Sequence, residues 1–161
     1  MFYQKSFLPQ IDDLNHGGYR TCRQLSETPA HQKEFIVETP LSHLAHLEIT
    51  APDVDASARF YEEKFGMRII DRVDGNVYLR CWGDYYRYSL VITEGPEASL
   101  GRMAWRTNSQ AALEAAAARV EATGVQGTWT AGGHGFGKAY EFTGPYGHHM
   151  RLFYDVEKFV A

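Results

Sequence analysis

Two adjacent histidines, His148 and His149, follow a Gly-Pro-Tyr-Gly turn and precede an apolar run in the stretch TGPYGHHMRLFYD, residues 143–155. Imidazole is a common metal ligand, so the pair raises the question of a metal site. Successive side chains of a strand point to opposite faces, so one strand cannot bring both rings to a single ion. Arg151 shares a face with His149 and is a permanent cation that repels a metal. We therefore expect both histidines to be polar residues beside the turn, hydrogen-bonded to the backbone.

A glycine-rich stretch, GGHGFGKA at 132–139, nearly matches the sequence motif of a phosphate-binding loop. Ala139, however, stands where such a loop has the Ser or Thr that binds magnesium. A phosphate loop also needs a helix after it, whose first amides hold the phosphate, whereas AYEFTGPYG follows here as a strand and a turn. We predict a flexible hairpin or rim loop in which glycines supply positive φ angles.

Regular elements that must position these residues begin near residue 43. LAHLEIT (44–50) alternates as a strand does. PDVDASARFYEEKFG (52–66) has helical spacing, with Asp53 or Asp55 as N-cap and Gly66 as the stop. Strand patterns then follow at 67–73, 76–82 and 88–94, the first two separated by an Asp-Gly turn.

The same order of elements then repeats. A strand pattern at 100–107 precedes an alanine-rich helix at 108–124, capped by Asn108 or Ser109 and ended by Gly124. Further strand patterns occupy 126–130, 137–143 and 147–154. When the two copies are overlaid, Leu44 falls on Leu100, His46 on Arg102 and Gly66 on Gly124, which indicates an internal repeat.

Each copy leaves an apolar sheet face that a single helix covers only in part, so the two copies must pair. The predicted fold class is α+β: two tandem βαβββ modules, about 43–95 and 99–158, pair into a cup-shaped mixed sheet with the helices on the outside. Residues 43–161 form this domain. Residues 1–42 are predicted to be an irregular N-terminal extended arm that packs on the domain or reaches a partner; the alternative is a disordered or loosely docked terminus.

Composition excludes several classes of function. The 161 residues are 44% hydrophobic, enough for the core of one domain. The formal net charge of -4 and the lack of a basic run argue against nucleic acid as a partner. No apolar run is long enough to span a bilayer, and no signal peptide is evident, so we expect no membrane partner and a cytoplasmic protein. Cys22 and Cys81 form neither a disulfide framework nor a zinc-site spacing.

Three stretches resemble a known family: LAHLEITAPDVDASARFYEEKFGMRIIDR, NVYLRCWGDYYRYSLVITEG and GPYGHHMRLFYD. With the repeat, they are similar to the vicinal oxygen chelate superfamily, the glyoxalase/bleomycin resistance/dioxygenase fold. The similarity is strongest to the N-terminal domain of type I extradiol dioxygenases of the catechol 2,3-dioxygenase kind, and it covers about residues 43–158. The chain also ends about where that first domain would lead into a second.

The resemblance implies a site for Fe(II) held by two histidines and one glutamate, with positions left open for catecholate and dioxygen. Carried onto this sequence, those ligand positions are His46, Arg102 and Arg151. Only His46 is a possible ligand, so we expect no iron in this chain and assign no catalytic residue. We expect Arg102 and Arg151 to pair instead with Glu48 or Glu141 across the sheet.

The resemblance therefore implies a structural and oligomerisation half of a dioxygenase of aromatic catabolism, inactive when isolated. Its partners would be a missing catalytic domain or further copies of the chain, and a catechol-like substrate enters by resemblance only. A second hypothesis is a metal-free protein that binds small aromatics in the cup. The aromatic residues at 82, 85, 86, 88 and 105 could line it, although we expect most of them to be ordinary core. A third is a metalloenzyme that uses His46 with His134 or His149, completed by a partner subunit.

Overall fold

A computed structural model of the protein describes residues 39–160. The predicted N-terminal arm lies outside the described residues apart from its last four positions, and Leu41 and Ser42 already belong to the first strand. Within the described part of the chain, no helix is both long and apolar enough to cross a membrane. The elements follow in the order β1 (Leu41–Ala51), α1 (Val54–Phe65), β2 (Arg68–Val73), β3 (Asn76–Arg80), β4 (Leu90–Glu94), β5 (Ser99–Thr107), α2 (Gln110–Ala122), β6 (Gly127–Thr130), β7 (Ala139–Thr143) and β8 (His149–Phe153).

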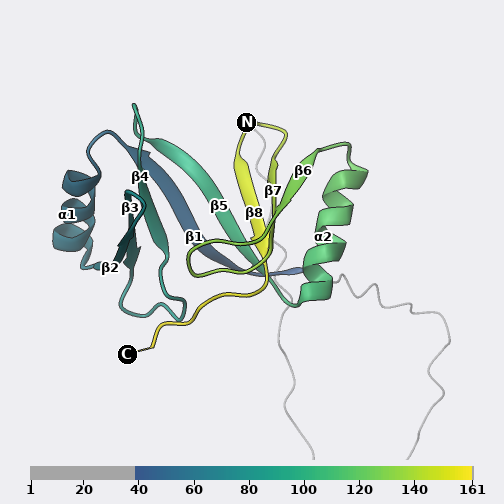
Figure 1. The fold of residues 1–161 in the computed structure, drawn as a ribbon, viewed down its shortest axis with the longest axis horizontal. Helices are drawn as coiled ribbons and strands as arrows, with labels where there is room; N and C mark the ends of the chain where they lie inside the picture. Colours follow the sequence, from purple (N-terminus) through teal and green to yellow (C-terminus); the bar gives the residue numbers. More distant parts are fainter. Residues whose placement is uncertain (1–38, 161) are drawn as a thin grey trace, which may run out of the picture. The chain divides into compact units, whose positions relative to one another are not determined.

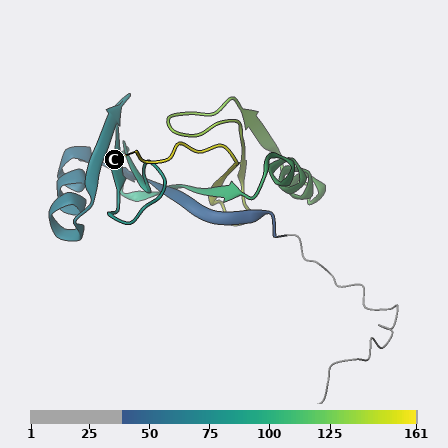
Figure 2. The ribbon, with the colours of Figure 1, turned by 90° about the horizontal axis from the view of Figure 1, so that it is seen from below.

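The strands of residues 39–160 form a single mixed sheet in the order β2-β3-β4-β1-β5-β8-β7-β6 (Figure 1). One strand–helix–three-strand module supplies each half, and the antiparallel pair β1–β5 joins the halves. The sheet curves, with α1 and α2 on the outer sides of its two halves (Figure 2). The predicted α+β fold, with two βαβββ modules paired into a cup-shaped mixed sheet, is confirmed.

Strand register shows how closely the two modules correspond. Leu47 of β1 lies opposite Leu90 of the parallel strand β4, and Met103 of β5 lies opposite Met150 of the parallel strand β8. Leu47 and Met103 are themselves partners at the centre of the sheet. A two-fold rotation about this central pair therefore exchanges the modules.

The overlay predicted from the sequence places Leu47 on Met103 and is confirmed by this register. His46 and Arg102 consequently occupy equivalent places in the two central strands. Side chains that alternate with Leu47 and Met103 face away from the helices, into the cup.

Both helices begin and end where local chemistry requires. The Asp53 carboxylate accepts a hydrogen bond from the Ala56 amide at 2.8 Å, and the hydroxyl of Ser109 accepts one from the Ala112 amide at 3.0 Å. These caps satisfy amides that have no partner within the helix. Gly66 ends α1 with a φ of 69°, a left-handed conformation that favours glycine. Of the predicted alternatives, Asp53 and Ser109 are the caps.

Each helix covers its own half of the sheet with small and aliphatic side chains. Ala58 of α1 and Leu113 of α2 are fully buried at the centres of these two layers. A third cluster lies next to His46 on the other face and consists of Ala45, Ala104, Ala139 and Phe153, packed by Tyr86, Phe136 and Val156. The first two layers lie on the side of the sheet that the helices cover, and the third cluster packs on the opposite side beside His46.

Gly127, at the start of β6, packs directly against the ring of Tyr140. A Cβ atom at this position would lie 2.3 Å from the Tyr140 Cζ atom, and Tyr140 is fully buried. We expect Gly127→Ala to lower the free energy of unfolding by about 1–3 kcal/mol, because a packed core has no room for the methyl group. Urea denaturation measures the loss. Gly144→Ala is the matched control, since a Cβ there meets no atom closer than 3.6 Å; equal losses for the two variants would contradict the prediction.

Candidate functional site on the concave face of the sheet

The three positions that correspond to metal ligands in the resemblance, His46, Arg102 and Arg151, come together on the concave face. Glu48 lies opposite Arg102 across β1–β5, and Glu141 lies opposite Arg151 across β7–β8. Arg151 binds both acids: its Nε donates to Glu141 Oε1 at 2.7 Å and its Nη1 donates to Glu48 Oε1. Arg102 Nη1 lies 3.4 Å from an oxygen of each carboxylate. The predicted pairing of both arginines with Glu48 or Glu141 is confirmed.

We call Glu48, Arg102, Glu141 and Arg151 the Glu–Arg cluster. Arg151 is only 7% exposed and His46 only 4% exposed. Burial lowers the pKa of His46 below 6.5, so its imidazole is neutral at pH 7. Burial by itself would raise the pKa of Glu48, but the hydrogen bond with His46 and the charges of Arg151 and Arg102 outweigh burial and bring this pKa down to about 2.

His46 Nε2 lies 3.4 Å from Glu48 Oε1. Because an ionised carboxylate only accepts hydrogen bonds, the Nε2 atom of the neutral ring carries the proton. The ring nitrogen that faces the cluster is therefore a donor, with no lone pair directed at a cation there.

The donor set does not fit a divalent cation. A metal needs lone pairs from neutral imidazole or from free carboxylate oxygens at about 2.0–2.2 Å. Arg151 already occupies Oε1 of both Glu48 and Glu141, and the guanidinium of Arg102 adds a second positive charge within 3.4 Å of the same carboxylates. Among residues 39–160, no three His, Cys, Asp or Glu side chains gather in a way that could hold a metal ion.

The other candidate histidines, His134 and His149, have partners of their own. His134 Nε2, in the loop between β6 and β7, lies 3.0 Å from Asp71 Oδ2. His149 Nδ1 lies 3.1 Å from the Thr143 hydroxyl oxygen. The prediction of a bond to the backbone is wrong for the His149 side chain, because the β7–β8 register places Thr143 directly opposite it.

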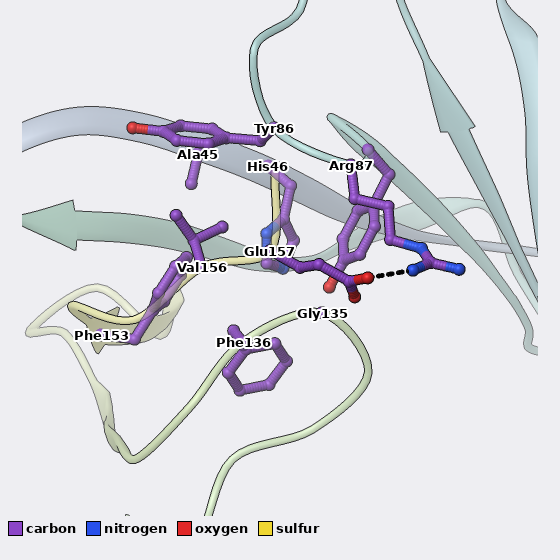
Figure 3. A pocket seen from close by; sticks show the side chains of 10 residues that line it. Ala45, His46, Tyr86, Arg87, Gly135, Phe136, Phe153, Val156 and Glu157 are labelled. Atoms are coloured by element: carbon purple, nitrogen blue, oxygen red, sulfur yellow. Dashed lines mark hydrogen bonds and ion pairs between the residues drawn. The ribbon is translucent and has the colours of Figure 1, made fainter. Parts of the chain in front are cut away.

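Aromatic and aliphatic side chains close around His46 (Figure 3). The imidazole centroid lies 4.9 Å from that of the Tyr88 ring, 5.8 Å from that of Phe153 and 6.1 Å from that of Phe136. Val156 and Glu157 of the C-terminal segment complete the enclosure, and Glu157 forms an ion pair with Arg87. Among residues 39–160, this enclosure leaves no room for a water molecule beside the His46 ring.

Phe136 also lines a second cavity, of about 270 Å³, which borders three members of the Glu–Arg cluster: Glu48, Glu141 and Arg151. The rim is the predicted glycine-rich loop: Gly133 and Phe136 pair through their backbones, and Gly132 and Gly135 have φ angles of 113° and 78°. Tyr88 lies just before β4, and its hydroxyl donates a hydrogen bond to the carbonyl of His134 at 2.5 Å. This bond ties the loop to the segment that leads into β4. The prediction of a hairpin or rim loop is confirmed. The cavity is lined by Glu48, Asn76, Tyr78, Tyr88, Val91, Thr93, Thr130, Gly132, Gly133, His134, Phe136, Glu141 and Arg151.

Of the aromatic residues predicted to line the cup, Tyr86 and Tyr88 do so. Tyr85 joins them only in a separate groove of about 320 Å³ beside β1. Trp82 is 86% exposed, and Trp105 packs on the layer covered by α2. The core position expected for most of these residues holds for Trp105, which points to the convex face in the alternation of β5. Trp82, just after the end of β3, lies neither in the core nor in the cup.

The model of the Glyoxalase/Bleomycin resistance protein/Dioxygenase superfamily matches residues 43–152, and the chain belongs to this superfamily. It is 41% identical over 117 residues to a metapyrocatechase from Geobacillus stearothermophilus, a match that covers 73% of this chain and 36% of the relative. It is 32% identical over 120 residues to a manganese-dependent 2,3-dihydroxybiphenyl 1,2-dioxygenase from Geobacillus genomosp. 3, covering 73% of this chain and 38% of the relative.

Solved structures give the same picture of the fold. Homoprotocatechuate 2,3-dioxygenase from Arthrobacter globiformis superimposes with a TM-score of 0.71 at 26% identity, over 75% of this chain and 38% of that one. The Brevibacterium fuscum enzyme of the same name, as its E323L mutant, gives a TM-score of 0.71 at 24% identity and shares the fold over 34% of its length. The predicted resemblance to extradiol dioxygenases is confirmed, and this chain spans a little over a third of such relatives.

Proposed function

We propose that this chain is a metal-free, non-catalytic module of an extradiol ring-cleaving dioxygenase, with a structural and oligomer-building role. The observation that carries the proposal is the position of Arg151, whose buried guanidinium lies between Glu48 and Glu141. A divalent ion at this place would have to displace a cation that is covalently tethered to the site.

The similarity to metapyrocatechase supports a role within such an enzyme, because the match spans 36% of that relative. In this proposal the ring-cleaving activity, its Fe(II) or manganese and its catechol-like substrate belong to a whole assembly that acts in the cytoplasm in aromatic catabolism. Large apolar side chains on the surface of the chain suit an interface with a catalytic domain or with further copies: Phe60 and Phe65 of α1, together with Trp82, are exposed.

The test uses protein purified without a histidine tag, because a tag would bring its own metal. We expect the chain, incubated with Fe(II) or Mn(II) and then desalted, to retain far less than one metal ion per chain. We also expect no coloured ring-fission product from catechol above a blank with metal alone. The metapyrocatechase of Geobacillus stearothermophilus, assayed in parallel, is the positive control. Stoichiometric metal together with turnover would defeat the proposal.

A second candidate function is a metal-free protein that binds small aromatics, and the cavity of about 270 Å³ favours it. Its walls combine the rings of Tyr78, Tyr88 and Phe136 with a larger number of polar and charged side chains, a mixture that suits an aromatic ligand carrying hydroxyl groups. Calorimetric titration of the same preparation with catechol and related phenols separates the two candidates. Saturable heat without turnover would favour the binding protein. A flat response across the panel would favour the structural module.

A further inference from the structure

The concave face carries the walls of a cation site. Glu48 of β1 and Glu141 of β7 direct carboxylate oxygens at the same guanidinium, and the Phe136 ring lies on one side of it with 4.4 Å between its centroid and the Arg151 Cζ atom. Two carboxylates in reach of one planar cation, with an aromatic face beside them, are the features that recognise guanidinium groups. All three wall residues also line the cavity of about 270 Å³, which reaches the site from outside.

We propose that this is a built site for a planar organic cation, and that the chain fills it with its own Arg151 where a metal ion would be expected. The inference rests on the proposed function and adds to it the chemical class of cation to which the site is complementary. Arg151 uses two different nitrogens for the two acids, Nε for Glu141 and Nη1 for Glu48, so a flat fork of donors matches the spacing of the acceptors.

A divalent metal lacks this match. It would have to draw Glu48, Glu141 and His46 to one point at about 2.0–2.2 Å, whereas a guanidinium binds acceptors on its different edges. His46 faces Glu48 with a protonated nitrogen, and its ring is held among Tyr88, Phe136 and Phe153. A metal-ligand geometry would therefore require the aromatic packing around His46 to change.

Shortening Arg151 to alanine leaves the two carboxylates and the Phe136 ring in place and opens the site to the adjoining cavity. We expect Arg151→Ala to lower the melting temperature by about 10 °C or more, as for the loss of one partner from a buried ion pair. Ethylguanidinium at millimolar concentration should then raise the melting temperature saturably, by roughly 4 °C at ten times its Kd. The wild-type chain should show no such rise, because Arg151 already occupies the site.

Three controls define the chemistry. N-ethylurea has nearly the same shape without the charge, and sodium chloride supplies the same ionic strength without the shape. Arg151→Ala combined with Glu141→Gln removes one wall of the site and should lose the response to ethylguanidinium. Mn(II) and Fe(II), added to Arg151→Ala, should give a smaller shift than ethylguanidinium.

The inference is overturned when ethylguanidinium fails to stabilise Arg151→Ala, when N-ethylurea does so equally well, or when a metal ion does so better. If Arg151→Ala does not fold alone, recovery of its circular dichroism on refolding with ethylguanidinium is the readout, and failure to recover counts against the inference. Arg151→Lys and Arg151→Met supply an independent comparison, in which lysine must be the more stable of the two. Ring cleavage by the wild-type chain would defeat the proposed function, whereas these outcomes bear on the cation site alone.

Discussion

Replacing Arg151 by methionine is expected to lower the free energy of unfolding by about 3–5 kcal/mol, the usual cost of removing one partner of a buried ion pair. The loss arises chiefly from what remains. Glu48 and Glu141, each about three-quarters buried, would be left facing each other, and among the described arginines and lysines only Arg102, at 3.4 Å, would offset their charges. Methionine keeps most of the side-chain volume, so the change measures charge and hydrogen bonding more than packing. Urea denaturation at pH 7 gives the value.

Arg102→Met is the matched control, because Arg102 belongs to the same cluster but its side chain is 28% exposed and its nearest carboxylate oxygens are 3.4 Å away. For this variant we expect a loss of at most about 1 kcal/mol. A loss for Arg151→Met no larger than that for Arg102→Met would show that Arg151 is not the cation that balances the two acids. Adding Glu48→Gln and Glu141→Gln to Arg151→Met should recover part of the stability, since the unpaired charges are then gone.

The Glu–Arg cluster shows why much of the fold and part of the site follow from local pattern. Alternation along β1, β5 and β8 fixes which side chains face the cup, and the internal repeat places His46 and Arg102 at equivalent positions. Helix spacing with Asp53 and Gly66 at the ends of α1 defines that element from short-range chemistry alone. A guanidinium on the inner face then calls for a carboxylate on a neighbouring strand.

Local pattern misses the contacts that the loop between β6 and β7 makes with strands distant in the sequence. Phe136 beside Arg151, and Asp71 with His134, join residues that no periodicity links. Strand ends shift for a similar reason: β7 begins at Ala139, two residues later than predicted, because the Gly137 amide donates to the Asp155 carbonyl instead of to a ladder partner. The glycine-rich sequence predicts a loop, but it does not predict which residues of the cup that loop contacts.

Acid is expected to destabilise the chain in two steps that belong to His46 and Glu48. The pKa of His46 is lowered by burial, so the unfolded chain takes up its proton first, and stability falls as the pH drops below about 6.5. The pKa of Glu48 is about 2 in the folded chain against 4.5 in the unfolded chain. Its contribution, on the order of 3 kcal/mol, is therefore complete above pH 4.5 and is lost as the pH falls towards 2.

Two variants separate these steps in urea denaturation from about pH 7.5 to about pH 3. His46→Phe keeps an aromatic ring among Tyr88, Phe136 and Phe153 but cannot be protonated, so its stability should stay level below pH 6.5, where that of the wild type declines. Glu48→Gln should be less stable at neutral pH and should lose less below pH 4.5. Asp71, whose pKa is lowered chiefly by its hydrogen bond with Arg87, titrates in the same acidic range in both chains and cancels in the difference. Parallel curves for His46→Phe and the wild type between about pH 7 and about pH 5 would mean that the buried imidazole does not set the upper step, and that His46 is already protonated inside the cup.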